Sequence, residues 1–293
     1  MSSRGPRLPA GEVRFARDFP ARLAALELRL AGALLRREGP GAGALMGGGE
    51  DLAGFRPYRP GEDLRQLDWN LFARLERPFV RVTRREAGER WAVAVDRSAS
   101  MGCGPPGKLQ RAAECAAALA VLGARQGAEV ELFVAGDEDR APRRFPFRPR
   151  EGTAALLAFL ESLEAARSAG LGTLLEVPQR YHQAGRLFAL GDLFDLELAQ
   201  VAALRRGGRE LCVLQLLSPE ELDPSSGGVE WWDPEAGERL RLEVDGARLS
   251  RYHEALEARL EAWRRSAAAH RIRFACRSSA TPFEELVRDL LGA

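Results

Sequence analysis

The sequence predicts an α/β protein with a mainly parallel, Rossmann-type sheet flanked by helices. From residue 91 onward, short apolar runs alternate with longer stretches of helical spacing. The run WAVAVD (91–96), for example, precedes KLQRAAECAAALAVLGARQG (108–127). Strands that alternate with helices of this length are typical of parallel sheets covered on both faces.

The later elements continue the same alternation. We expect further strands at 128–136, 143–148, 186–192, 210–218 and 272–278. We expect helices at 152–166, 173–185, 196–207, 251–270 and 282–292. The segment WWDPEAGERLRLEV predicts a hairpin inserted near 229–246, and its paired tryptophans suit either a core or an interface.

Residues 1–90 are expected to form an N-terminal extension that precedes an α/β domain at 91–293. Leucines at helical spacing predict an amphipathic helix at 17–38. Residues 39–50 are rich in glycine, which indicates a flexible connection. The alternating run PFVRVTRRE (78–86) predicts a strand, so the extension combines a helix with β structure.

Composition indicates a folded protein without a strong overall field. Hydrophobic residues make up 45% and charged residues 29% of the chain, and the formal net charge is +1. A nearly neutral chain offers no general attraction for nucleic acid. No apolar run approaches the roughly 18 residues of a membrane span, and the N-terminus lacks the apolar region of a signal peptide. We therefore expect a cytoplasmic protein that binds no nucleic acid and does not span a membrane.

Candidate metal ligands follow two predicted strands. Asp96, Ser98 and Ser100 are spaced i, i+2 and i+4, so in an extended segment their side chains project to one side. Asp192 ends the strand RLFALGD (186–192). The carboxyl ends of parallel strands meet at one edge of a sheet, where ligands bind. Carboxylate and hydroxyl oxygens suit Mg²⁺ or Mn²⁺.

A further oxygen ligand must come from elsewhere in the chain. Thr173, in the sequence AGLGT, is our first choice, and Thr153 is the competing candidate. Asp195 is a possible substitute for Asp192, although it falls after the predicted strand. The serines and threonines also suit helix caps or turns, which is the alternative interpretation of each of them taken alone.

Together, Asp96-x-Ser98-x-Ser100, Thr173 and Asp192 resemble the metal-ion-dependent adhesion site of von Willebrand A domains, and the order of elements from 91 to 293 resembles that fold. The resemblance implies that the serines and the threonine coordinate the metal directly, while the aspartates often act through water. It also implies that an acidic side chain of a partner protein fills the open metal position.

The N-terminal segment FRPYRPGEDLRQLDWNLFARLERPFVRVTRRE (55–86) resembles a bacterial family catalogued as domain of unknown function number fifty-eight. The resemblance covers nearly the whole chain beyond residue ~20, although Glu62 and Phe72 depart from the family pattern. Members of that family typically accompany MoxR-type AAA+ ATPases. The resemblance therefore implies a partner that is either such an ATPase or a client protein that presents an acidic residue.

We accordingly expect a metal-dependent, protein-binding adaptor that is not an enzyme and that works with a MoxR-type ATPase in assembling or remodelling complexes. The alternative is a stand-alone scaffold that binds an envelope component. Nucleotide hydrolysis is disfavoured because GCGPPGKL (102–109) has leucine where a phosphate-binding loop needs a hydroxyl, and two prolines that lack amide hydrogens. Ester hydrolysis is disfavoured because no histidine is placed near Asp96 as a general base.

Overall fold

The computed structural model of the chain describes residues 11–34, 51–57, 72, 79–84, 89–135, 142–149, 152–166, 170–175, 181, 184–204 and 209–292. The predicted flexible connection at 39–50 lies outside these residues. Most of the N-terminal segment that carries the family resemblance also lies outside them.

The described residues divide into two compact units. Those up to Ala33 form one unit with those from Glu89 onward, and Leu34–Gly88 form the other. The second unit contains an antiparallel pair of strands, β1 (Asp51–Pro57) and β2 (Phe79–Arg84). The first helix thus belongs with the α/β unit, so the chain does not divide at a single boundary near residue 90.

The larger unit is built on a six-stranded sheet with the order β10-β7-β6-β3-β4-β5. Its strands are β3 (Arg90–Val95), β4 (Glu129–Val134), β5 (Arg143–Phe147), β6 (Arg186–Gly191), β7 (Glu210–Leu217) and β10 (Arg273–Ser278). Neighbouring strands are parallel except at the edge, where β5 is antiparallel to β4. The predicted α/β class with a mainly parallel sheet is confirmed.

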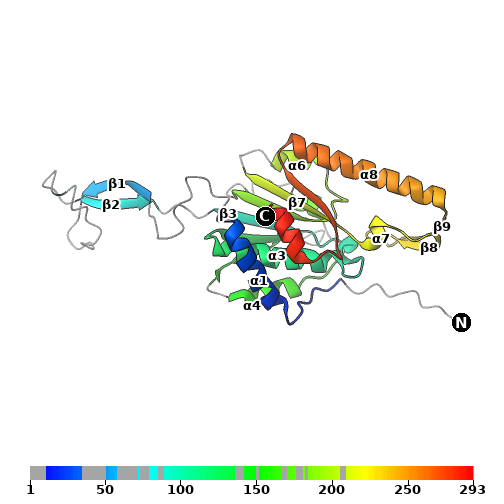
Figure 1. Cartoon of the computed structure of the whole chain (residues 1–293), viewed down its shortest axis with the longest axis horizontal. Coiled ribbons are helices and arrows are strands. Elements are labelled where there is room, and N and C mark those ends of the chain that lie inside the picture. The colour runs from blue at the N-terminus through cyan, green and yellow to red at the C-terminus, as the bar shows by residue number, and fades with distance from the viewer. Residues whose placement is uncertain are drawn as a thin grey trace. The chain divides into compact units, whose positions relative to one another are not determined.

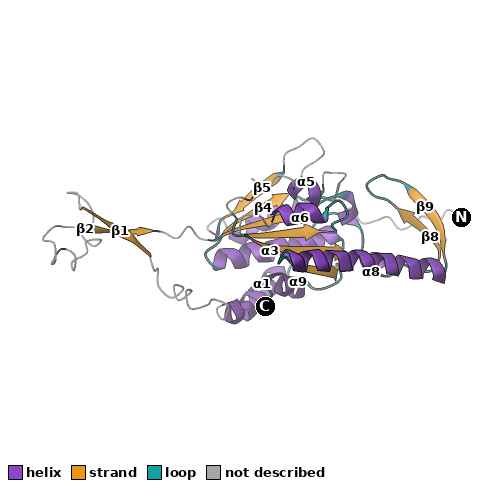
Figure 2. Ribbon diagram, turned by 90° about the horizontal axis from the view of Figure 1, so that it is seen from above, coloured by secondary structure: helices purple, strands orange, loops and turns teal. Residues whose placement is uncertain are grey.

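Helices cover both faces of this sheet (Figures 1 and 2). One face carries α1 (Phe19–Leu34), α3 (Lys108–Arg125), α4 (Gly152–Glu161) and α9 (Phe283–Leu291). The other carries α5 (Leu171–Leu175), α6 (Leu198–Leu204) and α8 (Gly246–Ala269). Shorter elements are the 3₁₀ helix η2 (Ala99–Gly102), helix α7 (Pro219–Leu222) and the antiparallel hairpin of β8 (Gly227–Trp232) and β9 (Arg239–Val244).

The central strand β3 is buried from both sides, as its uninterrupted apolar run requires. Trp91 faces α3, where a Cβ at Gly123 would lie 2.6 Å from Cε3 of the indole. Glycine at this position therefore lets the ring pack against the helix. Ala92 and Ala94 belong to the core on the opposite face, together with Trp263 of α8. Alternate residues of one strand thus join two separate helix layers to the sheet.

Some elements differ in extent from the prediction. Of the helix expected at 173–185, the structure describes α5, which begins earlier, at Leu171, whereas residues 176–180 lie outside the described residues. Helix α8 also begins earlier than expected, at Gly246, because Asp245 caps it by accepting a hydrogen bond from the amide of Arg248 at 2.8 Å. Within the described part of the chain, no helix is long and apolar enough to cross a membrane.

Helix α1 is attached to the α/β unit by an aromatic cluster and an ion pair. Phe19 is 1% exposed, and its ring centroid lies 4.9 Å from that of Phe283 in α9. Arg22 forms a forked pair with Glu284, with N–O distances of 2.7 and 2.8 Å. The partners come from opposite ends of the chain, so α1 completes the layer that also contains α9.

We predict that Phe19→Ala lowers the free energy of unfolding by about 3 kcal/mol, because it removes a buried ring and leaves a cavity between two helices. Leu28→Ala on the same helix is the matched control, since Leu28 is 80% exposed. That variant should change stability by less than about 0.5 kcal/mol. Urea unfolding measures both. Equal stabilities for the two variants would contradict the packing of α1 described above.

Candidate metal site

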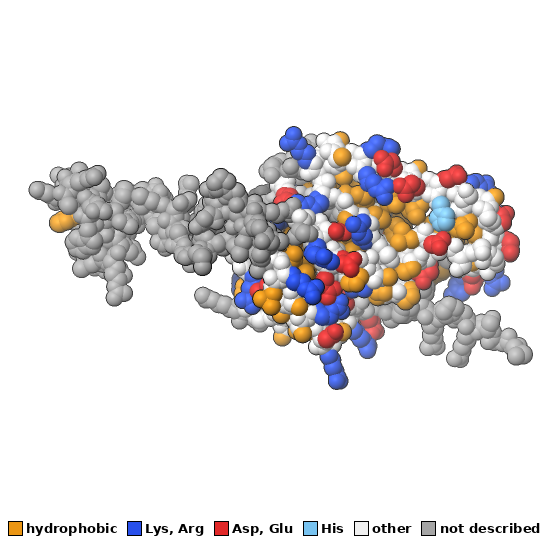
Figure 3. Space-filling view, viewed as in Figure 1, with side chains coloured by type: hydrophobic (Ala, Val, Ile, Leu, Met, Phe, Trp, Pro, Cys, Tyr) orange, Lys and Arg blue, Asp and Glu red, His pale blue; other side chains and the backbone are white. Residues whose placement is uncertain are grey.

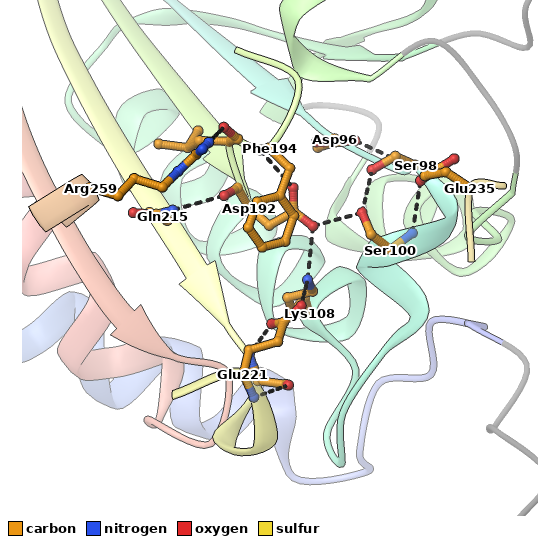
Figure 4. A network of polar contacts seen from close by, with 12 residues as sticks. Asp96, Ser98, Ser100, Lys108, Asp192, Phe194, Gln215, Glu221, Glu235 and Arg259 are labelled. Carbon is orange, nitrogen blue, oxygen red and sulfur yellow. Dashed lines mark hydrogen bonds and ion pairs between the residues drawn. The ribbon is translucent and has the colours of Figure 1, made fainter. Parts of the chain in front are cut away.

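Two buried aspartates follow neighbouring strands of the sheet. Val95 of β3 and Leu190 of β6 are paired in the parallel ladder, and the amide of Asp96 donates to the carbonyl of Leu190 at 2.9 Å. Asp96 is 0% exposed and Asp192 is 1% exposed. The two acids that end these strands therefore lie together at the carboxyl edge of the sheet (Figure 4).

Two serine hydroxyls connect the aspartates. Oδ1 of Asp96 accepts a hydrogen bond from the amide of Ser98 at 2.8 Å. The hydroxyl oxygens of Ser98 and Ser100 lie 3.1 Å apart, and the hydroxyl of Ser100 donates to Oδ2 of Asp192 at 2.7 Å. The backbone enters the 3₁₀ helix η2 at Ala99 instead of remaining extended. Nevertheless, these four predicted ligands form one connected network.

The second carboxylate oxygen of Asp96 is buried and has no hydrogen-bond donor within the described structure. Room for it exists because residue 191 is glycine, where a Cβ would lie 2.9 Å from this oxygen. Burial, and secondarily the charge of Asp192, raises the pKa of Asp96 to about 7. A buried carboxylate oxygen that has no donor among the described residues is a candidate ligand for a cation.

Lys108, the first residue of α3, provides a positive charge inside this network. Its ammonium is 0% exposed and donates to Oδ2 of Asp192 at 2.8 Å and to Oε1 of Glu221 at 2.7 Å. Burial alone would lower the pKa of Lys108. The charges of Asp192 and Glu221 outweigh that effect, so its pKa lies above the ordinary value and the lysine remains charged.

The sequence indicated the position of Lys108 but not its role. Lys108 is the only lysine in the chain, which was the one available signal. The predicted helix at 108–127 begins with this lysine, but its two acidic partners were not foreseen. Glu221 follows β7 in the capping box of the short helix α7, 113 residues from Lys108. No local pattern predicts such a contact.

Thr173 lies in the first turn of α5 with an exposed side chain. Helix α5 contacts both β3 and β6, the strands that the aspartates follow, whereas the helix α4 that carries Thr153 packs against α3 and β5. Among the hydrogen bonds of the described residues, none joins either threonine to the aspartate and serine network. Asp195 accepts a hydrogen bond from the amide of Gly172 at 2.8 Å, which connects it with α5.

A fourth acidic side chain reaches the network from the β8–β9 hairpin. Glu235, in the turn between the two strands, accepts a hydrogen bond from the amide of Ser100 at 2.9 Å. The sequence analysis predicted the hairpin but did not connect it with the site. The two residues are 135 positions apart, so only the tertiary fold brings them together.

The arrangement fits a hard divalent cation such as Mg²⁺ or Mn²⁺. Ser98 and Ser100 supply hydroxyl oxygens, and the free Oδ2 of Asp96 supplies a carboxylate oxygen. Asp192 has one oxygen shared by Ser100 and Lys108, while its Oδ1 accepts only a long hydrogen bond of 3.3 Å from the amide of Phe194. Within the described ranges, no group of three or more His, Cys, Asp or Glu side chains is arranged to hold a metal ion, so a cation here would depend on the serine hydroxyls as well as the carboxylates.

Comparison with known protein families identifies the family of the chain. Residues 54–262 match the model of a family described as "Protein of unknown function DUF58". The chain belongs to this family. The matched residues include Asp96, Lys108, Asp192 and Glu235, and therefore the whole network described above.

Individual relatives carry no established activity. Uncharacterized proteins of Mycobacterium bovis and Mycobacterium tuberculosis are 28% identical to this chain over 217 residues, which cover 70% of the chain and 67% of each relative. A solved structure, an aerotolerance-related membrane protein from Bacteroides fragilis with multiple mutations to serines, is similar with a TM-score of 0.42 and 16% identity. The match covers 70% of this chain and 98% of that one.

We predict that Lys108→Met destabilises the protein by about 3 kcal/mol or more, because it leaves the buried carboxylate of Asp192 without its counter-charge. Arg264→Met is the control, since it breaks an exposed, solvent-screened ion pair with Glu257 and should change stability little. The double variant Lys108→Met/Asp192→Asn should recover part of the loss. Urea unfolding of the three variants measures the effects, and similar losses for Lys108→Met and Arg264→Met would contradict the buried pair.

Proposed function

We propose that this protein is a non-catalytic adaptor that binds a partner protein through a Mg²⁺ or Mn²⁺ ion held at the carboxyl edge of the sheet. The unpartnered Oδ2 of Asp96, buried beside two serine hydroxyls, is the observation on which the proposal chiefly rests. In this proposal the domain is von Willebrand A-like, and the site is of the metal-ion-dependent adhesion type.

The proposed ligands are Asp96, Ser98, Ser100, Thr173 and Asp192. The serine hydroxyls and Oδ2 of Asp96 supply the oxygen atoms that would coordinate the ion directly. Asp192 would act through water, because its carboxylate is shared with Lys108. A bound divalent ion would act as a Lewis acid that attracts a carboxylate from outside the chain. Thr173 would need to turn toward the site from its exposed position in α5.

The partner in this proposal is a MoxR-type AAA+ ATPase, or a client that such an ATPase remodels. The family resemblance supports the ATPase, and the open coordination position of a metal supports an acidic side chain as the contact. The ATPase would supply energy, and the metal face would supply selectivity. We place the adaptor in the cytoplasm, where it would meet an ATPase. In the alternative, the protein is a stand-alone scaffold, and the same site binds an envelope component.

Nucleic acid is not a favoured partner. On the face seen in Figure 3, basic and acidic side chains of the described residues are interspersed and do not gather by sign. Interspersed charges cannot neutralise a run of phosphates, on which affinity for nucleic acid mainly depends. The net charge of +1 agrees with this interpretation.

Enzymatic alternatives find little support in the contacts of the site. The ammonium of Lys108, which a phosphate-binding loop would aim at a nucleotide, is enclosed by Asp192 and Glu221. Of the histidines that a serine nucleophile would need, His253 pairs with Asp223, and His270 contacts the carbonyl of Ser266. His182 lies outside the described residues.

Capture of a co-encoded MoxR-type ATPase by the full-length chain tests the proposal. We expect capture in Mg²⁺ and at least a ~10-fold loss in EDTA, because a bridging metal would contribute more than 1.4 kcal/mol. Asp96→Asn should lose capture to the same extent. Asp289→Asn is the matched control, because it also removes one carboxylate. Asp289 lies on α9, where it forms an ion pair with Arg277 of β10.

Capture of the ATPase that is insensitive to both EDTA and Asp96→Asn would contradict a metal-bridged contact. Absence of capture in Mg²⁺ would contradict the ATPase as the direct partner. In that case, the same comparison with an envelope fraction as prey would test the scaffold alternative.

A further inference from the structure

The hydrogen bond between Ser100 and Glu235 places a carboxylate of the chain itself at the candidate metal site (Figure 4). Oε1 of Glu235 accepts from the amide of Ser100 at 2.9 Å, while the hydroxyl of the same serine belongs to the network around Asp192. In the proposed function, a partner delivers its acidic side chain to this side of the network. The chain therefore already contains a group with the chemistry expected of the partner.

The turn that carries Glu235 has a defined conformation. Oδ1 of Asp233 accepts hydrogen bonds from the amides of Glu235 at 2.8 Å and Ala236 at 3.1 Å. The amide of Gly237, which has a φ of 74°, donates to the carbonyl of Asp233 at 2.7 Å. Glycine is suited to this left-handed position because it has no Cβ. These hydrogen bonds lie within the turn and do not involve the contact between Glu235 and Ser100.

The attachment of the hairpin is otherwise light. Trp231 and Trp232 are 39% and 40% exposed, and Leu240 is 57% exposed, so of the residues of β8 and β9 only Val244, at the end of β9, is buried in the core. Trp231 packs edge-on against Tyr252 of α8, with ring centroids 5.9 Å apart. The Ser100–Glu235 bond is itself exposed to solvent, so water or another carboxylate can replace Glu235 at little cost.

A second route also connects the hairpin with the site. The hydroxyl of Tyr252, which packs against Trp231, donates to the backbone carbonyl of Glu221, and the side chain of Glu221 pairs with Lys108. Lys108 in turn pairs with Asp192. Movement of the hairpin away from α8 would therefore change the contacts of both Ser100 and Lys108.

We propose that the amide of Ser100 is a carboxylate-binding position that Glu235 fills from within the chain, so that the β8–β9 hairpin is a displaceable competitor of an acidic partner segment. This inference rests on the proposed function for the identity of the partner surface, but the carboxylate position does not require the metal. A partner must present a carboxylate on an exposed turn, as the hairpin does. Tethering gives Glu235 a high effective concentration, so partner binding is weak until the hairpin opens.

Binding of a labelled peptide to the full chain tests this inference. The probe is a fluorescein-labelled synthetic peptide with the sequence of residues 229–240, which includes the turn and its acidic residue. We compare wild type, Glu235→Ala and the matched control Glu238→Ala, which changes an exposed glutamate of the same turn. Fluorescence anisotropy in Mg²⁺ and in EDTA gives the affinities.

We expect Glu235→Ala to bind the peptide at least ~10-fold more tightly than wild type or Glu238→Ala, because the internal competitor is lost. A gain in both buffers supports a carboxylate position at Ser100 that is independent of metal. A gain in Mg²⁺ alone supports a position that the metal strengthens. No gain in either buffer overturns the inference, whereas the proposed function is judged separately by capture of the ATPase with Glu235→Ala beside the wild type.

Amide hydrogen exchange provides a second readout that does not depend on the peptide. Exchange of the Ser100 amide should accelerate in Glu235→Ala and remain unchanged in Glu238→Ala. Thermal unfolding of the two variants should coincide, because the lost bond is exposed. Unchanged exchange at Ser100 in Glu235→Ala would overturn the inference even if the peptide bound.

Discussion

The burial of two carboxylates at the ends of adjacent strands is the constraint on which this end of the molecule depends. Asp96 and Asp192 are almost completely removed from water, and each therefore needs hydrogen bonds or an opposite charge. Asp192 obtains both, from Ser100 and Lys108. Asp96 obtains an amide for one oxygen and, among the described residues, no donor for the other, and burial raises its pKa to about 7. In the proposed function, this imbalance between the two acids favours an added cation at Asp96.

The surrounding elements serve this pair of acids. Helix α3 begins with Lys108, so the element that covers the central strand also delivers the counter-charge. The short helix α7 holds Glu221 against the same ammonium, and α8 supports Glu221 through Tyr252. The β8–β9 hairpin contributes Glu235, which accepts a hydrogen bond from the amide of Ser100. A change in any one of these contacts therefore alters the electrostatics of the site as well as local packing.

The sequence predicted the frame of the site better than its electrostatics. Alternation of apolar runs and helical stretches was sufficient for the parallel sheet, and the rule that parallel strands end at one edge brought Asp96 and Asp192 together. The partners of Lys108 and Ser100 could not be predicted, because Glu221 and Glu235 come from later turns whose position only tertiary packing determines. Helix α1 shows the same limit, since its periodicity predicts a helix but does not reveal that Phe19 packs against Phe283. Thr173 lies in a helix next to both strands, yet its side chain is exposed, and no spacing rule specifies the direction of a side chain in so short a helix.

Calorimetric titration of the metal-free protein with Mg²⁺ and Mn²⁺ tests most directly whether the buried carboxylate of Asp96 binds a cation. The account predicts a single saturable site in the wild type and in Asp289→Asn, and no binding heat in Asp96→Asn, which keeps the side-chain shape but removes the charge. Equal binding heats in Asp96→Asn and the wild type would contradict the account, because the metal would then be held by residues other than the buried pair.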